Sequence, residues 1–234
     1  MWQRRAGTAV MVTMSCVLAV ACSSESSMPV DGTSSASVAA KSLTDYLLQP
    51  SDVPAGFQKQ QIPSGATVSP LADVTAGAKV SPTSCKPPES AAAAKEAASA
   101  PAALFGDGVG GTTIVAAVGK ASAGVNGSVE SFRRYNLGDC ATHTLTAEVD
   151  GAQVTATQTA APIEVDTAGV NGVVAARIRS MAKASGSNID ATQFVAVLPV
   201  PDGAVLVSVS KLRGAPDEAV FRQVVAAAAR RIAS

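Results

Sequence analysis

Two Asp-Gly pairs constrain the fold of this chain more than any other feature of its sequence. Each pair separates two runs of alternating or β-branched residues: 142–149 and 152–159 flank Asp150-Gly151, and 194–201 and 204–211 flank Asp202-Gly203. An Asp-Gly pair in this setting is typical of a two-residue type I′ turn, which joins neighbouring antiparallel strands. The sequence therefore predicts two β-hairpins.

Both hairpins place apolar residues on one face. In the first, the turn pairs Val149 with Ala152, Ala147 with Val154 and Leu145 with Ala156, and His143 lies at the end of that face. In the second, one face carries Phe194, Ala196, Leu198, Val200, Val205, Val207 and Val209. Pro199 has no N–H to donate, so we expect its strand to lie at a sheet edge or to contain a bulge.

The other predicted elements complete an α+β fold. Strands are predicted at 112–118 and 172–179; the second has Val174, Ala176 and Ile178 on one side and Arg177 and Arg179 on the other. Short helices are predicted at 41–49, 87–98 and 128–135, the last with Ser128 as N-cap. Pro216 begins a C-terminal helix with an apolar stripe of Phe221, Val224, Val225, Ala228 and Ile232. We expect a mainly antiparallel sheet of about five or six strands, covered by this helix.

Residues 1–21 have the organisation of an export signal. Arg4 and Arg5 form a short basic start, and the apolar stretch that follows is too short to span a bilayer. The Cys22 that follows Ala-Val-Ala resembles the lipobox cysteine of bacterial lipoproteins, whose sulfur receives a diacylglyceryl group. We expect Cys22 to carry this group and to hold the protein at the extracytoplasmic face of the cell membrane. The alternative is plain secretion.

A tether and one domain are expected after the signal. Residues 22–40 are Ser-rich, with Gly and Pro and no periodicity, as in a flexible tether with a root-mean-square length of roughly 25 Å. The remaining residues, 41–234, are enough for a single domain with a sizeable core. We therefore expect this domain to lie near the membrane without entering it.

Two cysteines, Cys85 and Cys140, are left for this domain, since Cys16 is removed with the signal. An exported chain with two such cysteines most simply pairs them, which would close a loop of about 55 residues and stabilise the fold by about 4 kcal/mol. The alternative is a metal or redox pair. The lack of a Cys-x-x-Cys motif and the presence of one His disfavour it, so we expect neither metal nor cofactor.

Charge and aromatic content disfavour some partners. The 18 basic residues include Arg4 and Arg5, so removal of the signal leaves 16 against 18 acidic residues, a net of about −2. No basic surface for nucleic acid is expected from this balance. Without the signal the chain contains no Trp, two Tyr and five Phe, and so offers few aromatic platforms for single-stranded nucleic acid or carbohydrate.

Three sequence patterns resemble functional motifs but lack the surroundings that their chemistry needs. Ser180 and Lys183 form a Ser-x-x-Lys pattern, but Ser180 falls at the end of a predicted strand and no Lys-Thr-Gly follows. Residues 106–111 contain G-x-G-x-x-G, yet a predicted helix precedes and a predicted strand follows, the reverse of a dinucleotide site. His143 has no G-x-S-x-G elbow to supply a nucleophile. We therefore expect no enzymatic activity.

Three residues are weak candidates for ligand binding. Arg177 and Arg179, two apart on one strand face, have the spacing to grip an anion, although solvated charges on a sheet face are the commoner outcome. His143 is the third, although a histidine at the rim of an apolar face is the commoner outcome for it.

The order of these features resembles the small mycobacterial lipoproteins of the Lpp, Lpq and Lpr type. The resemblance is carried by the lipobox, the Ser-rich tether, Leu-Leu-Gln-Pro-Ser-Asp-Val-Pro-Ala-Gly-Phe at 47–57, Ser-Pro-Thr-Ser-Cys ending at Cys85, Cys140, and a closing hairpin and helix. Some of these lipoproteins are similar to the extracellular sensor domain of PknH-type receptor kinases, which has two disulfides where this chain can form one. The resemblance implies an envelope location and a fold, but no functional motif.

The sequence thus favours a non-enzymatic, lipid-anchored envelope protein whose domain binds a small molecule, a lipid or an envelope protein. A second hypothesis is a carrier that encloses lipid or glycolipid acyl chains between sheet and helices. A third is a hydrolase whose site is too dispersed along the chain to recognise.

Overall fold

The computed structural model describes residues 41–62, 78–86, 100–108, 110–120, 128–149, 152–184, 187–211 and 214–234. These residues all belong to one unit, Ala40–Ser234. The predicted signal, Cys22, the tether and the helix predicted at 87–98 lie outside the described residues.

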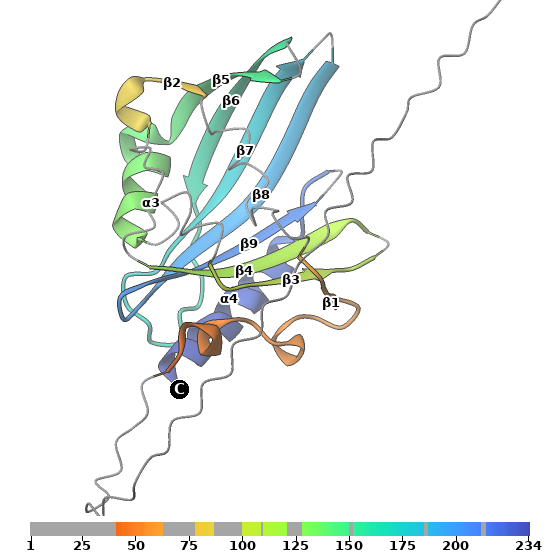
Figure 1. The fold of residues 1–234 in the computed structure, drawn as a ribbon, viewed down its shortest axis with the longest axis vertical. Coiled ribbons are helices and arrows are strands. Elements are labelled where there is room, and N and C mark those ends of the chain that lie inside the picture. Colours follow the sequence, from red (N-terminus) through yellow and green to blue (C-terminus); the bar gives the residue numbers. More distant parts are fainter. Residues whose placement is uncertain are drawn as a thin grey trace, which may run out of the picture. The chain divides into compact units, whose positions relative to one another are not determined.

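The described strands form a nine-stranded sheet in which every neighbouring pair is antiparallel (Figure 1). Their order is β1-β3-β4-β9-β8-β7-β6-β5-β2. The strands are β1 (Gln58–Gln60), β2 (Lys79–Ser81), β3 (Ala102–Gly106), β4 (Thr112–Lys120), β5 (Thr142–Val149), β6 (Ala152–Pro162), β7 (Val174–Ala184), β8 (Ser187–Val200) and β9 (Gly203–Lys211). In Figure 1, β5 to β8 run steeply and β9, β4 and β3 run at a shallower angle, as the twist of a large sheet requires.

The antiparallel sheet and the C-terminal helix confirm the predicted architecture, but the predicted number of strands is wrong. The three additional strands are β1, β2 and β3. β1 and β2 are edge strands of three residues each, too short to show an alternating pattern. β3 has an apolar sequence, Ala-Ala-Leu-Phe-Gly, which pairs with both β1 and β4.

Two α-helices and four short 3₁₀ helices are described around the sheet. The described helices are α3 (Val129–Asn136), α4 (Glu218–Ala233) and the 3₁₀ turns η1 (Leu43–Tyr46), η2 (Pro50–Asp52), η3 (Thr83–Cys85) and η5 (Gly138–Cys140). The single helix predicted at 41–49 is wrong, because the segment forms η1 and then extends before Pro50 begins η2. Ser128 is the N-cap of α3 as predicted, and its Oγ accepts a hydrogen bond from Ser131 N at 3.3 Å.

The main core lies between α4 and one face of the sheet. The predicted stripe of α4 faces this core: Phe221, Val224, Val225 and Ala228 are fully buried, and Ile232 packs at its margin. From the sheet, the predicted face of the second hairpin meets it, with Phe194, Ala196, Leu198, Val205, Val207 and Val209. Full burial of such side chains contributes about 1.5–3 kcal/mol each. Apolar packing is therefore what holds α4 to the sheet.

The segment before β1 closes one end of this core. Tyr46, Leu47, Leu48 and Val53 pack into it. Two polar contacts join the same segment to the last turn of α4: Lys41 Nζ donates to the Arg231 carbonyl at 2.9 Å, and Arg231 Nε lies 2.8 Å from Asp52 Oδ2. In Figure 1 this segment accordingly lies beside the C-terminus.

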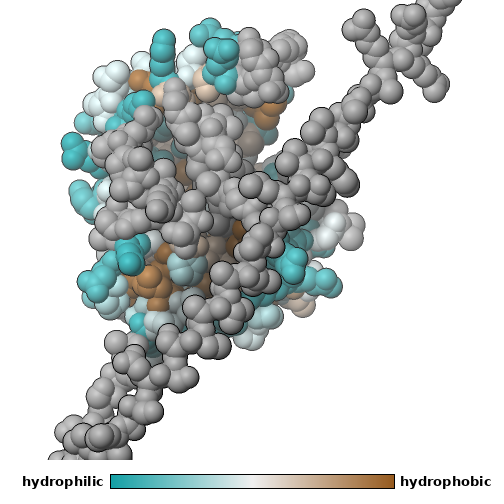
Figure 2. Space-filling model, in the orientation of Figure 1, coloured by the Kyte–Doolittle hydropathy of each residue, from teal (hydrophilic) through white to brown (hydrophobic). Residues whose placement is uncertain are grey.

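The other face of the sheet carries a smaller core. Phe132 of α3 packs there against Val174, Ala176, Ile178, Val195, Val197 and Ala204, which confirms the face predicted for 172–179. Next to β5, Val80, Cys85, Cys140 and Leu145 form a third cluster around the Cys85–Cys140 disulfide. The predicted disulfide is thus confirmed. Figure 2 shows hydrophilic residues around the rim of the described surface, with apolar residues visible between them.

The first predicted hairpin has the predicted register. β5 pairs with β6 through Val149 and Ala152, Ala147 and Val154, and Leu145 and Ala156. Asp150 and Gly151 themselves lie outside the described residues. The register leaves these two residues between the strands.

The second hairpin keeps its predicted face but not its predicted turn. Val200 pairs with Gly203, so the turn residues are Pro201 and Asp202 instead of Asp202 and Gly203. A turn at Asp202-Gly203 would make Pro201 the last residue of the strand. That position needs a backbone N–H for the sheet hydrogen bonds, and Pro has none. With Pro first and Asp202 second at φ 63°, the turn has the type II pattern.

Gly203 is instead required by the neighbouring strand. It pairs with Lys120 of β4, and a Cβ added to it would lie 2.1 Å from the Gly119 carbonyl oxygen.

The predicted edge position of Pro199 is found for this residue but not for its whole strand. β8 is a central strand, but its pairing with β7 ends at Val197, so Pro199 has only β9 beside it.

Candidate functional site

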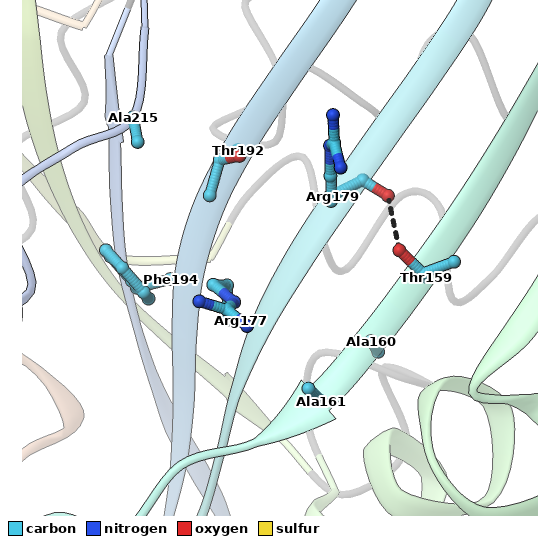
Figure 3. A pocket seen from close by; sticks show the side chains of 8 residues that line it. All are labelled: Thr159, Ala160, Ala161, Arg177, Arg179, Thr192, Phe194 and Ala215. Atoms are coloured by element: carbon cyan, nitrogen blue, oxygen red, sulfur yellow. Dashed lines mark hydrogen bonds between the residues drawn. The ribbon is translucent and has the colours of Figure 1, made fainter.

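An open hollow of about 470 Å³ lies on the α4 side of the sheet, over β6, β7 and β8 (Figure 3). Its lining residues are Thr159, Ala160, Ala161, Arg177, Arg179, Thr192, Phe194 and Ala215. Two cross-strand rows supply most of them: Ala161, Arg177 and Phe194 form one row, and Thr159, Arg179 and Thr192 form the next. The volume falls in the range of about 300–1,000 Å³ typical of small-molecule sites.

The hollow arises where the cover provided by α4 ends. β9 pairs with β8 only from Gln193 onward, and Ala215 lies just before α4 begins at Glu218. Phe194 is the last buried residue of the core in this direction, and its ring stacks on Phe221 of α4 with centroids 5.3 Å apart. One end of the hollow is therefore a rigid aromatic wall.

Arg179 is held by a carboxylate. Its Nε and Nη2 donate to the two carboxylate oxygens of Asp190, at 2.9 and 2.5 Å. These hydrogen bonds lower the pKa of Asp190 and raise the pKa of Arg179. Asp190 belongs to β8, and a fork-to-fork pair of this kind fixes the guanidinium in one orientation. Thr159 Oγ1 lies 3.5 Å from the carbonyl of Arg179 on the adjoining strand (Figure 3).

Arg177 differs from Arg179. Its side chain lies beside Phe194 in Figure 3, and it is exposed. Among the residues that the structure describes, it forms no ion pair or hydrogen bond through its guanidinium. Arg177 lines the hollow, and its five N–H donors have no acceptor among the described residues.

The third candidate, His143, lies elsewhere. It pairs with Gln158 on the opposite face of the sheet, is buried, and its Nδ1 is 2.9 Å from the Cys140 carbonyl. The contact fixes the ring next to the disulfide. Of the three sequence candidates, the structure brings together Arg177 and Arg179 but not His143.

Apart from Arg177 and Arg179, the contributors to the hollow were not identified as such from the sequence: Thr159, Ala160, Ala161, Thr192, Phe194, Ala215 and the Asp190 that pairs with Arg179. Asp190 and Thr192 lie on the first half of β8, which extends further toward its N-terminus than the predicted strand. Alternation at 187–193 was the available signal, since it places Asp190 and Thr192 on the face of Phe194. Phe194 was assigned only to the core, and nothing local indicates that Ala215 reaches the sheet.

The structure shows where two of the motif-like sequence patterns lie. Ser180 and Lys183 both lie within β7, three residues apart, so their side chains point to opposite faces. Gly106 ends β3, and β4 begins one residue after Gly111, so the glycine-rich segment joins two strands. The helix predicted before this segment, at 87–98, lies outside the described residues, and the strand β3 directly precedes the segment.

The described residues contain no group of three or more His, Cys, Asp and Glu side chains arranged to hold a metal ion. Within the same ranges, no helix has both the length and the apolar character needed to cross a membrane.

No known protein family, curated protein or solved structure matches the chain.

Proposed function

We propose that this chain is a lipid-anchored, non-enzymatic binding protein of the cell envelope. Cys22 carries a diacylglyceryl anchor at the extracytoplasmic face of the membrane, and residues 22–40 tether the domain to it. The domain binds a ligand in the hollow over β6, β7 and β8. This proposal extends the expectation from the sequence by naming the binding site.

The observation that carries the proposal is the free Arg177 inside the hollow. A cation that has no protein partner in the described structure, next to a buried aromatic ring, is suited to hold a ligand. Catalysis needs a nucleophile with a base or a bound metal, and the lining offers only Thr159 and Thr192 as hydroxyls, with no histidine or carboxylate among the lining residues.

The second candidate function, a carrier of lipid or glycolipid acyl chains, is favoured by the apolar side chains of Ala161, Phe194 and Ala215 in the lining. The space between α4 and the sheet, however, is occupied by Phe221, Val224 and Val225, each fully buried. A whole acyl chain would need to displace them. An open hollow at the surface suits a shorter ligand.

Native mass spectrometry of the protein purified from its own envelope tests the binding role. A bound small molecule that is lost in Arg177→Gln supports the proposal. A co-purifying lipid with full-length acyl chains, retained in Arg177→Gln, would favour the carrier. Turnover of generic ester or amide substrates would instead support a hydrolase.

The anchor is tested by Cys22→Ala, with Cys16→Ala as the matched control. We expect Cys22→Ala to leave the detergent phase and the membrane fraction, and Cys16→Ala to remain there, because Cys16 lies inside the removed signal. Membrane attachment of both variants alike would contradict lipidation of Cys22.

A further inference from the structure

We infer that the hollow over β6, β7 and β8 recognises an amphipathic monoanion: a carboxylate or a phosphodiester attached to a short apolar group. The inference rests on the proposed binding function and names the ligand class of the same site. It is based on two observations. Arg179 is paired with Asp190 whereas Arg177 has no partner among the described residues, and apolar side chains lie beside Arg177.

The charge of the site selects a single negative charge. Arg177 and Arg179 line the hollow, and Asp190 neutralises one of them through its two hydrogen bonds. The remaining charge is that of Arg177. A carboxylate or phosphodiester supplies one negative charge and two terminal oxygens, which match the fork of a guanidinium.

The N-terminus of α4, the positive end of its dipole, is not the group that binds the anion. Asp217 caps it, with its Oδ1 accepting a hydrogen bond from Ala219 N at 2.8 Å. Any ligand near Ala215 therefore meets a helix end whose first turn already has an acidic partner. Arg177 is the group left to bind the anion.

The apolar residues of the hollow require the second part of the ligand. Three of the lining residues, Ala161, Phe194 and Ala215, offer hydrocarbon, whereas Ala160 packs against the core on the other face of the sheet. Phe194 lies directly across from Arg177 on the neighbouring strand, so an anion bound to Arg177 has its attached group over the hydrocarbon lining. A bare inorganic anion would leave this lining exposed to water and gain nothing from it.

The role of Asp190 is to position Arg179. Arg179 is bound to Asp190, and Thr159 and Thr192 flank it on the two neighbouring strands. Arg179 is thus a positioning residue and Arg177 the ligand-binding one. Removing Asp190 frees a second cation, which shifts the preference of the site toward dianions.

Binding of small probes tests the inference. The full lipidated chain is placed in nanodiscs of phosphatidylcholine, with empty nanodiscs as the blank, and binding is followed from the arginine Nε–Hε signals in NMR spectra. The probes are hexanoate and dibutyl phosphate as amphipathic monoanions, acetate as an anion without the apolar group, and hexanol as the neutral amphiphile. The stronger binder of the first two identifies a carboxylate or a phosphodiester source.

We expect the better amphipathic monoanion to bind about tenfold or more tightly than acetate or hexanol, as charge-assisted hydrogen bonds imply. Arg177→Gln should reduce its affinity to that of hexanol, and Arg177→Lys should restore part of it. Arg133→Gln is the matched control, because Arg133 is exposed on α3 and pairs with Glu130 at 3.3 Å. Ala161→Leu, which fills the hollow without changing charge, should weaken all amphipathic probes.

Two results would overturn the inference. One is equal affinity for hexanoate, dibutyl phosphate and acetate, and the other is unchanged binding in Arg177→Gln. If no probe binds but native mass spectrometry finds an Arg177-dependent ligand, the ligand class is wrong and the binding role stands. If neither method finds a ligand, the binding role falls as well.

Discussion

The two ends of the sheet are stabilised in different ways. The α4 end, comprising β1, β3, β4 and β9 with α4, is held by apolar packing: Phe105, Ile114, Val207, Phe221 and Val224 are all fully buried. The cystine end, comprising β2, β5 and β6, has only a small apolar cluster around Cys85–Cys140. Its strands instead pair threonines with threonines: Thr142 with Thr159, Thr144 with Thr157, and Thr146 with Thr155.

The difference shows how one sheet combines a stable core with an exposed site. Apolar burial is concentrated at the α4 end, and such burial is the dominant favourable contribution to folding. The cystine end forms few apolar contacts and uses a covalent link and cross-strand threonine pairs, each worth a fraction of a kcal/mol to about 1 kcal/mol. The hollow lies over β6, β7 and β8, where the cover by α4 ends and a residue such as Arg177 is not needed for packing.

The largest effect is expected at the α4 end. Phe221→Ala removes a fully buried ring that stacks on Phe194, and should lower the free energy of unfolding by about 3–5 kcal/mol. Urea unfolding followed by circular dichroism measures this loss of unfolding free energy. Gln223→Ala, at an exposed position of the same helix, is the control and should change little. A loss below about 1 kcal/mol for Phe221→Ala would mean that α4 is not the main source of stability.

Removal of the disulfide should have the next largest effect. Cys85→Ser with Cys140→Ser opens a loop with a sequence separation of 55 residues and should cost about 2–4 kcal/mol. Hydrogen exchange should rise in β2 and β5 much more than in β4 and β9. Wild-type protein treated with a reductant should show the same loss of unfolding free energy. Uniform exchange across the sheet would remove the distinction between the two ends.

A smaller effect is expected from one added methyl group between β9 and β4. Gly203→Ala puts a Cβ against the Gly119 carbonyl and should cost about 1–3 kcal/mol. Asp202→Gly alters the turn without adding an atom near β4, so it should leave stability nearly unchanged. If Asp202→Gly proved the more damaging of the two in thermal unfolding, the turn and not the strand contact would set the register.

The smallest effect is expected at the exposed Arg179–Asp190 pair. The hydrogen bonds from Arg179 lower the pKa of Asp190 below its ordinary value of 3.8. A carboxyl with a depressed folded pKa contributes stability above its unfolded pKa and loses it as pH falls through the folded pKa. An NMR titration of the Asp190 carboxyl carbon should therefore show a midpoint below 3.8 in the wild type, and a return toward 3.8 in Arg179→Gln. A wild-type midpoint at or above 3.8 would contradict the pairing.

The parts of the fold that sequence reasoning predicts are those with long local patterns. The faces of both hairpins, the alternation at 172–179 and the stripe of α4 all depend on periodicity that a single segment contains. The register of the second hairpin was mispredicted because Pro201 and the contact of Gly203 with Gly119 outweigh the local turn preference. β1 and β2 were missed because a strand of three residues is defined by its partner, not by its own sequence.

The candidate site follows the same division. Arg177 and Arg179 were recognised because two residues on one strand share a face. Their different states depend on Asp190, which pairs opposite Met181 on a neighbouring strand, and on Ala215, which reaches the hollow from beyond β9. These relations join separate parts of the chain, so no local pattern contains them.

The contacts of the segment before β1 have a mechanical consequence. Lys41 and Asp52 both contact Arg231 in the last turn of α4, and Leu48 is buried against the same helix. A force applied through the N-terminal part of the chain therefore acts first on these contacts, near the C-terminus of α4. The sheet hydrogen bonds experience that force only after the segment and the helix end have separated, so β6, β7 and β8 are protected against pulling from that end.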